Sequence, residues 1–147
     1  MSQKRALRLS ESLEDYLEAV HEVARRDGVV RAKAVASCLG VKASSVTEAV
    51  RQLVQRRLAR HAPYGAVVLT TAGERRARSV ARRHRVLKEF LVRVLGIDAV
   101  AADASACHLE HDLPPGAVVR LERLTAFLEA QPETRHSALR EIIEQRT

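Results

Sequence analysis

The chain has 147 residues, of which 46% are hydrophobic, 29% charged and 3% aromatic. This length and apolar content suit one or two small domains with a real hydrophobic core. No apolar run approaches the about 18 residues of a membrane span, and the N-terminal segment MSQKRALRLSESLEDYL lacks the apolar stretch of a secretory signal. Cys38 and Cys107 form no CxxC pair, which excludes a disulfide scaffold and a zinc ribbon. We therefore expect a reduced, cytoplasmic protein with no membrane partner.

Charge is distributed unevenly along the chain. Residues 1–97 carry 20 Lys and Arg against 9 Asp and Glu, whereas residues 98–147 carry 5 against 9. A basic first part joined to an acidic remainder suggests a face that binds a polyanion and a second unit with another role. The alternative is an Arg-rich surface that has no such partner.

Helical periodicity dominates the start of the chain. One stripe of apolar residues recurs at helical spacing: Leu13, Tyr16, Leu17, Val20 and Val23. This stripe predicts a helix that is capped by Ser10 or Ser12 and ends at Gly28. A second, short helix is predicted over 31–39, and a third from about 43 to 57.

The segment LARHAPYGAVVLT, which follows the third helix, is the only strand-like part of the sequence. Its Pro63–Gly65 turn between apolar residues predicts a β-hairpin. A long helix then begins at Thr70 or Thr71 and ends near Gly96. Three shorter helices follow it, over about 98–112, 115–130 and 134–145.

The order helix, helix, turn, helix and hairpin predicts a winged helix-turn-helix, in which the third helix enters the major groove of DNA. Small polar residues open that helix, so its first turn can approach base edges closely. The residues expected to reach phosphates or bases are Lys42, Ser44, Ser45, Thr47 and Arg51 on this helix, with Arg60 and Tyr64 in the wing. Taken singly, each of them has the alternative of a solvated surface side chain, which is the favoured interpretation for a single Ser or Arg, so the prediction depends on the combined order of the elements.

Several polar residues recur at helical spacings that suit a metal site. Asp15 and Glu18 can share one face of the first helix, and His84 falls within the apolar stripe of the long helix. The segment ADASACHLEHDL places four further donors on one helical face: Asp103, Cys107, Glu110 and His111. Thiolate, carboxylate and imidazole together suit a first-row divalent metal. The alternative for each is structural: a core or interface histidine, and a polar helix surface with a half-buried cysteine.

Cys38 is interpreted as structural. It is expected at a core position of the second helix, with no His, Asp or Glu nearby in the sequence to complete a metal site.

Four separated motifs occur in this order along the chain: LEDYLEAVHEV, LGVKASSVTEAVRQLVQRRL, LTTAGERRARSVARRHRVLKEFL and ACHLEHDL. Together they resemble the diphtheria-toxin-repressor and manganese-transport-regulator family over about residues 10–130. That resemblance implies a homodimeric transcriptional repressor activated by a divalent metal. The chain resembles the short members of the family, which lack a C-terminal SH3-like domain.

The resemblance also implies a ligand set, residue by residue. The metal ligands implied are Asp15, Glu18, His84, Cys107, Glu110 and His111. Asp15 follows the manganese-type pattern, whereas Cys107 stands where iron-type members carry cysteine. Mn(II) is therefore the expected metal and Fe(II) the alternative. Other first-row divalent ions are expected to bind in vitro. Lys88 departs from the family pattern at an ancillary site, where Asp103 is a possible further ligand. One or two ions per chain therefore remain open.

The sequence thus predicts a mainly α protein with a winged helix-turn-helix DNA-binding domain over 1–71. A linking helix and a helical metal-binding and dimerisation domain are predicted over 72–147. The expected function is metal-activated repression of metal homeostasis genes by a homodimer on a pseudo-palindromic, double-stranded DNA operator. Two alternatives are an iron-responsive repressor of the same family and a winged-helix regulator that senses a non-metal signal. An enzyme with a small organic substrate is not expected, because the sequence has no HExxH motif and no Gly-rich phosphate loop.

An apolar stripe in the last third of the chain allows two interpretations. Its members are Val118, Leu121, Leu124, Phe127 and Leu128. It forms either the dimer interface or the internal core of the second domain, and the sequence alone does not separate the two.

Overall fold

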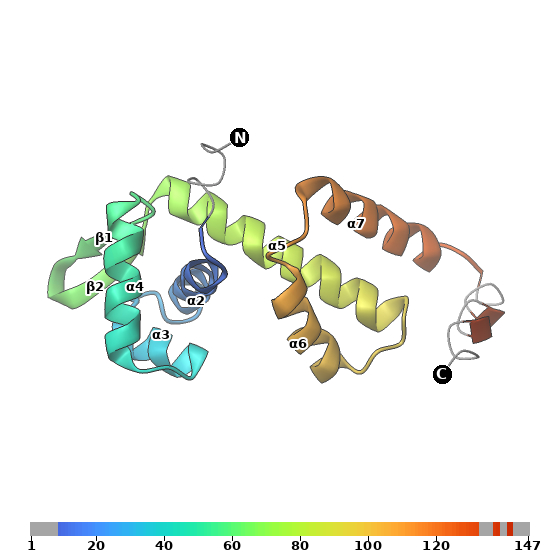
Figure 1. Ribbon diagram of the computed structural model, residues 1–147, viewed down its shortest axis with the longest axis horizontal. Coiled ribbons are helices and arrows are strands. Elements are labelled where there is room, and N and C mark those ends of the chain that lie inside the picture. The colour runs from blue at the N-terminus through green and yellow to red at the C-terminus, as the bar shows by residue number, and fades with distance from the viewer. Residues whose placement is uncertain (1–8, 133–136, 139–140, 143–147) are drawn as a thin grey trace. The chain divides into compact units, whose positions relative to one another are not determined.

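A computed structural model describes residues 9–132, 137–138 and 141–142 of the chain. Contacts divide the chain into two compact units, residues 1–80 and residues 81–147. Figure 1 shows the elements of each unit along the chain, and the boundary between the units falls inside helix α5, Thr71–Arg93. Among the described residues, no helix is long and apolar enough to cross a membrane.

The first unit begins with helix α2, Glu11–Asp27. The Ser10 hydroxyl accepts a hydrogen bond from the Leu13 N–H at 3.3 Å, so the predicted cap is confirmed at Ser10. Gly28 ends the helix with a φ of 75°, a conformation that favours glycine.

Helices α3, Ala32–Leu39, and α4, Ala43–Gln55, follow and form the helix-turn-helix. Gly40 makes the turn between them in the left-handed region, at φ 66°. Cys38 is exposed, so its predicted core position is wrong. Val35 and Ala36 are the buried residues of this short helix, and they leave Cys38 on its solvent side.

The wing is a two-stranded antiparallel sheet of β1, Ala59–Ala62, and β2, Ala66–Leu69. The predicted Pro63–Gly65 turn is present as a 3-10 turn, η1. An isolated antiparallel bridge between Val30 and Val67 joins β2 to the segment after α2. The hairpin is therefore held to the helices by backbone hydrogen bonding as well as by its own ladder.

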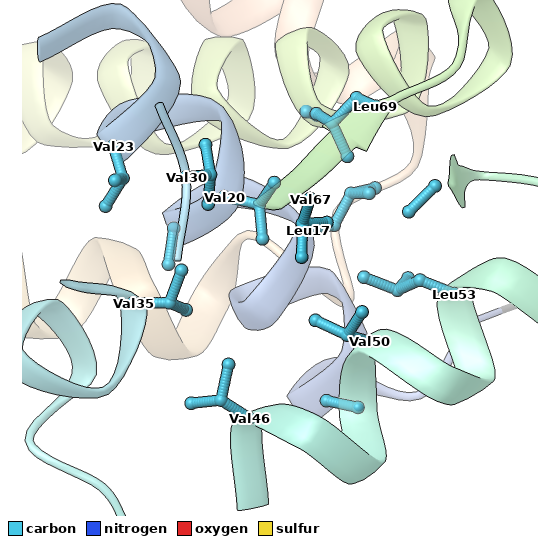
Figure 2. Packing of buried hydrophobic residues seen from close by; sticks show 14 of the residues in the cluster. Leu17, Val20, Val23, Val30, Val35, Val46, Val50, Leu53, Val67 and Leu69 are labelled. Carbon is cyan, nitrogen blue, oxygen red and sulfur yellow. The ribbon is translucent and has the colours of Figure 1, made fainter. Parts of the chain in front are cut away.

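The core of the first unit lies where α2, α3, α4 and the wing meet, as Figure 2 shows. The fully buried side chains labelled there include Leu17, Val35 and Leu53, one from each helix. Because these residues come from three helices, burying them fixes the helices against one another. The outward face of α4 is left exposed to solvent.

The junction between the wing and α5, Thr71–Arg93, depends on Thr70 and Gly73. The Thr70 hydroxyl donates to the Arg57 carbonyl at 2.8 Å and accepts from the Gly73 N–H at 3.1 Å. The Thr70 N–H also donates to the Leu58 carbonyl at 3.0 Å. A Cβ at Gly73 would lie 1.9 Å from that same carbonyl oxygen, so only glycine allows this approach.

The second unit contains the remainder of α5, helix α6, Ala99–Leu109, and helix α7, Pro115–Glu129. The Asp98 side chain caps α6 by accepting hydrogen bonds from the N–H groups of Val100 and Ala101. Ion pairs join α5 to α7, Arg82 with Glu122 and Arg93 with Glu129. Apolar residues from all three helices are buried: Val86, Leu87, Leu91, Ala102, Ala106 and Val118.

Two further helices were predicted in this unit. One ends earlier than predicted, and most of the other lies outside the residues that the structure describes. Helix α6 ends at Leu109, three residues before the predicted end, so Glu110 occupies its C-cap position. The helix predicted over 134–145 lies mostly outside the described residues.

Candidate metal-binding and nucleic-acid-binding residues

The residues predicted to contact DNA all belong to the first unit and are all exposed. They are Lys42, at the N-cap of α4, then Ser44, Ser45, Thr47 and Arg51 on α4, with Arg60 on β1 and Tyr64 in the turn. Tyr64 is 95% exposed and has a φ of 59°, so its ring stands clear of the fold at the end of the wing. An exposed aromatic ring and a row of polar side chains leave this surface available to a ligand.

A carboxylate lies within this surface, which the sequence reasoning missed. Glu48 accepts two hydrogen bonds from the Arg51 guanidinium, at 2.6 and 2.9 Å, and one from the Gln52 amide at 3.1 Å. These donors, Arg51 foremost, lower the pKa of Glu48 to about 2. The spacing of Glu48 and Arg51, three residues apart on a helix, could have identified the pair from the sequence.

The second unit brings His84 on α5 together with two other predicted metal-binding side chains, those of Glu110 and Asp103. The His84 Nδ1 lies 2.9 Å from Glu110 Oε2, and its Nε2 lies 3.1 Å from Asp103 Oδ1. Both nitrogens of one imidazole thus face carboxylates. This arrangement suits either a doubly protonated ring or a ring whose nitrogen binds a cation.

Glu110 is the most buried of these predicted metal-binding residues, because its relative exposure is 0%. Its second oxygen, Oε1, has no hydrogen-bond partner among the described residues. The imidazole Nε2 of His111 lies 3.7 Å from this oxygen, which is beyond hydrogen-bond length. A buried carboxylate oxygen without a donor is costly unless a cation completes it, so the residues present fit a divalent metal.

Asp103 differs from Glu110 in its surroundings. It is exposed on α6, and its Oδ1 lies 2.6 Å from the Lys88 ammonium as well as beside His84. These two hydrogen bonds, Lys88 first, hold the pKa of Asp103 below its usual range. Asp103 therefore already has a cationic partner, Lys88, within the protein.

The remaining predicted ligands are placed as follows. Cys107 is exposed on α6, and His111 is largely buried just after it. Helix α6 ends at Leu109, and Glu110 keeps helical backbone angles at its C-cap, so the shared face of the four donors stays a prediction, although Glu110 is buried while Asp103 and Cys107 are exposed. Asp15 and Glu18 are half-buried on α2 of the first unit, and their place in the same metal site stays a prediction.

A neighbouring acid on α2 has a structural role that the sequence did not indicate. Glu14 is 5% exposed and accepts two hydrogen bonds from the Arg76 guanidinium of α5, at 2.7 and 3.1 Å. This pair ties α2 to the start of α5 within the first unit. No local signal marks it, since its partners are 62 residues apart.

Comparisons with known proteins match the two parts of the chain to two different family profiles. A profile described as the iron dependent repressor N-terminal DNA binding domain matches residues 8–67. A second profile, described as the iron dependent repressor metal binding and dimerisation domain, matches residues 70–137.

Individual relatives are similar over most of the chain. An uncharacterized HTH-type transcriptional regulator of Methanocaldococcus jannaschii is 34% identical over 122 residues, covering 82% of this chain and 95% of the relative. The HTH-type transcriptional regulator MntR of Bacillus pumilus is 30% identical over 122 residues, covering 83% of this chain and 84% of that protein.

Among solved structures, the manganese regulator SloR superposes with a TM-score of 0.71 at 30% identity, over 78% of this chain. The match covers 54% of the SloR chain, so the present chain spans about half the length of that structure. With both profiles matched in order and with relatives matched over most of its length, the chain belongs to the iron-dependent repressor family, the diphtheria-toxin-repressor and manganese-transport-regulator group of metal-responsive transcriptional repressors.

Proposed function

We propose that this chain is a manganese-activated repressor that binds a pseudo-palindromic DNA operator as a homodimer and controls metal homeostasis genes. The observation that carries the metal part is the fully buried Glu110, whose Oε1 lacks a hydrogen-bond donor beside His84 and His111. The manganese preference is supported by the similarity to a protein described as a manganese regulator. The regulator is proposed to act in the cytoplasm, where its DNA partner is located, and no catalytic role is proposed.

The proposed ligands are Asp15, Glu18, His84, Cys107, Glu110 and His111. Carboxylate and imidazole donors suit Mn(II), and Fe(II) is the second candidate because the Cys107 thiolate is a softer ligand. When bound, a divalent cation would supply the positive charge that these carboxylates lack. Without it, Asp15, Glu18 and Glu110 would repel one another if brought together.

The proposed ligands come from both parts of the chain, so metal binding would be coupled to DNA binding. Asp15 and Glu18 belong to the DNA-binding unit, and the other four belong to the second unit. Holding all of them together would restrict how the two DNA-binding units of a dimer are spaced. A coupling free energy of about 1–3 kcal/mol is enough to change DNA affinity about 5–150-fold.

DNA binding is proposed to use the exposed face of α4 in the major groove and the wing along the backbone. The functional division proposed is 1–71 for DNA binding and 72–147 for metal binding and dimerisation. For the dimer, we propose the exposed part of the α7 stripe, since Leu124 and Phe127 are 45% and 60% exposed whereas Val118 is buried. The stripe would then serve both the domain core and the interface between copies.

The test is DNA binding measured by fluorescence anisotropy on duplexes selected from a random pool. We expect micromolar Mn(II) to raise the affinity at least about 5-fold over the same protein in EDTA. Titration with Fe(II) under anaerobic conditions and with Zn(II) ranks the metals. Equal affinity with and without every metal would contradict metal activation and would leave a winged-helix regulator that senses another signal.

Neutralising Glu48 is expected to strengthen sequence-independent DNA binding. Glu48→Gln removes a negative charge from the proposed DNA-binding face and releases the Arg51 guanidinium that Glu48 holds. The slope of log affinity against log salt concentration should steepen by about 1, because one more phosphate contact releases one more counterion. Anisotropy titrations on random-sequence DNA at several salt concentrations measure this slope.

Glu22→Gln provides the matched control, because Glu22 is exposed on α2 of the same unit and changes the net charge equally. Only the Glu48 substitution should change the slope. The same slope in both variants would mean that Glu48 and Arg51 lie outside the DNA-binding face.

A further inference from the structure

Lys88 occupies an unusual place in the proposed metal cluster. It lies four residues after His84 on α5, so both side chains lie on the same side of the helix. The Lys88 Nζ lies 2.6 Å from Asp103 Oδ1, and His84 Nε2 lies 3.1 Å from that same oxygen. One carboxylate oxygen is therefore shared by an ammonium and an imidazole.

The two sides of His84 differ in what they offer a metal ion. On the Nδ1 side, Glu110 is fully buried and its Oε1 has no hydrogen-bond donor among the described residues. On the Nε2 side, the Asp103 carboxylate is already neutralised by a cation that the protein carries itself. A divalent ion on this second side would have to displace the ammonium or accept its repulsion.

We propose that Lys88 acts as a built-in cation that takes the place of a second metal ion, so that the chain binds one divalent ion and not two. Asp103 is then a positioning residue: it holds the His84 ring through Nε2 and leaves Nδ1 directed toward Glu110. Carboxylates commonly orient metal-binding histidines in this way. The inference rests on the proposed function, because it assumes that the ion binds beside Glu110.

The experiment counts the manganese ions bound per chain by equilibrium dialysis followed by elemental analysis. The wild-type protein should bind one ion at saturation. Lys88→Glu removes the ammonium and adds a carboxylate four residues from His84, so this variant should bind two ions. Lys88→Gln, which keeps the side-chain length and removes the charge, should bind a second ion at higher Mn(II) concentration and serves if Lys88→Glu does not fold.

Arg85→Glu is the matched control, because Arg85 is exposed on the same helix and undergoes the same change of charge. It should still bind one ion. Two ions on the wild-type protein, or one ion on both folded Lys88 variants, would overturn the inference. No bound ion on any of the proteins would contradict the proposed metal site itself, and this inference with it.

Discussion

Glu110→Gln is expected to lower the affinity of the protein for Mn(II) by at least about 100-fold, since even residues that only support a ligand cost 10–100-fold. The substitution keeps the size of a completely buried side chain and removes its charge. Without metal, the variant should be at least as stable as the wild type, because a neutral amide is less costly to bury than a carboxylate. Metal binding and stability without metal should therefore change in opposite directions.

Thermal unfolding with and without Mn(II) measures both effects. At a free metal concentration 100 times the wild-type Kd, binding stabilises the wild-type protein by about 2.7 kcal/mol, and a 100-fold weaker variant gains only about 0.4 kcal/mol. The matched control is Glu129→Gln, whose carboxylate is paired with Arg93 at 2.5 Å on the surface of the same unit. An unchanged metal response in Glu110→Gln would remove Glu110 from the ligand set.

Gly73→Ala is expected to lower the free energy of unfolding by about 3 kcal/mol, the upper part of the range for inserting atoms into packed sites. The added Cβ would lie 1.9 Å from the Leu58 carbonyl oxygen, which belongs to the backbone and cannot rotate away. That carbonyl also accepts the Thr70 N–H, so relieving the clash disturbs the hydrogen bonds that join the wing to α5. Chemical denaturation with a helical signal measures the change.

Gly116→Ala is the control for the general effect of replacing a helical glycine. Nothing lies within 4 Å of a Cβ at Gly116, so its substitution should change stability by less than about 1 kcal/mol. Equal effects at the two positions would show that the close approach at Gly73 does not limit the fold.

Local signals in the sequence were enough to find the elements of the first unit. Ser10 and Gly28 mark the ends of α2, and Gly40 marks the turn before α4, because capping and positive φ depend on the residue itself and its neighbours. The wing followed from its turn residues. The sequence pattern did not predict the end of α6, because the residues after Leu109 continue a plausible helical pattern and no glycine interrupts it.

Side-chain burial and partnership were harder to predict. Cys38 fits an apolar stripe in the sequence, yet it is exposed, because an eight-residue helix buries only the part of its surface that its neighbours cover. The Glu14–Arg76 pair joins residues 62 positions apart, so no local pattern predicts it.

The sequence by itself determined the order of elements, the winged helix and the residue types of the proposed metal and DNA sites, because these depend on periodicity, capping and donor chemistry. Only the tertiary structure decided what each donor faces. It buried Glu110 beside His84, paired Asp103 with Lys88 and left one carboxylate oxygen without a hydrogen-bond donor among the described residues. These features arise where α5 and α6 pack together, and the environment of a charge there is set by neighbours that are distant in sequence.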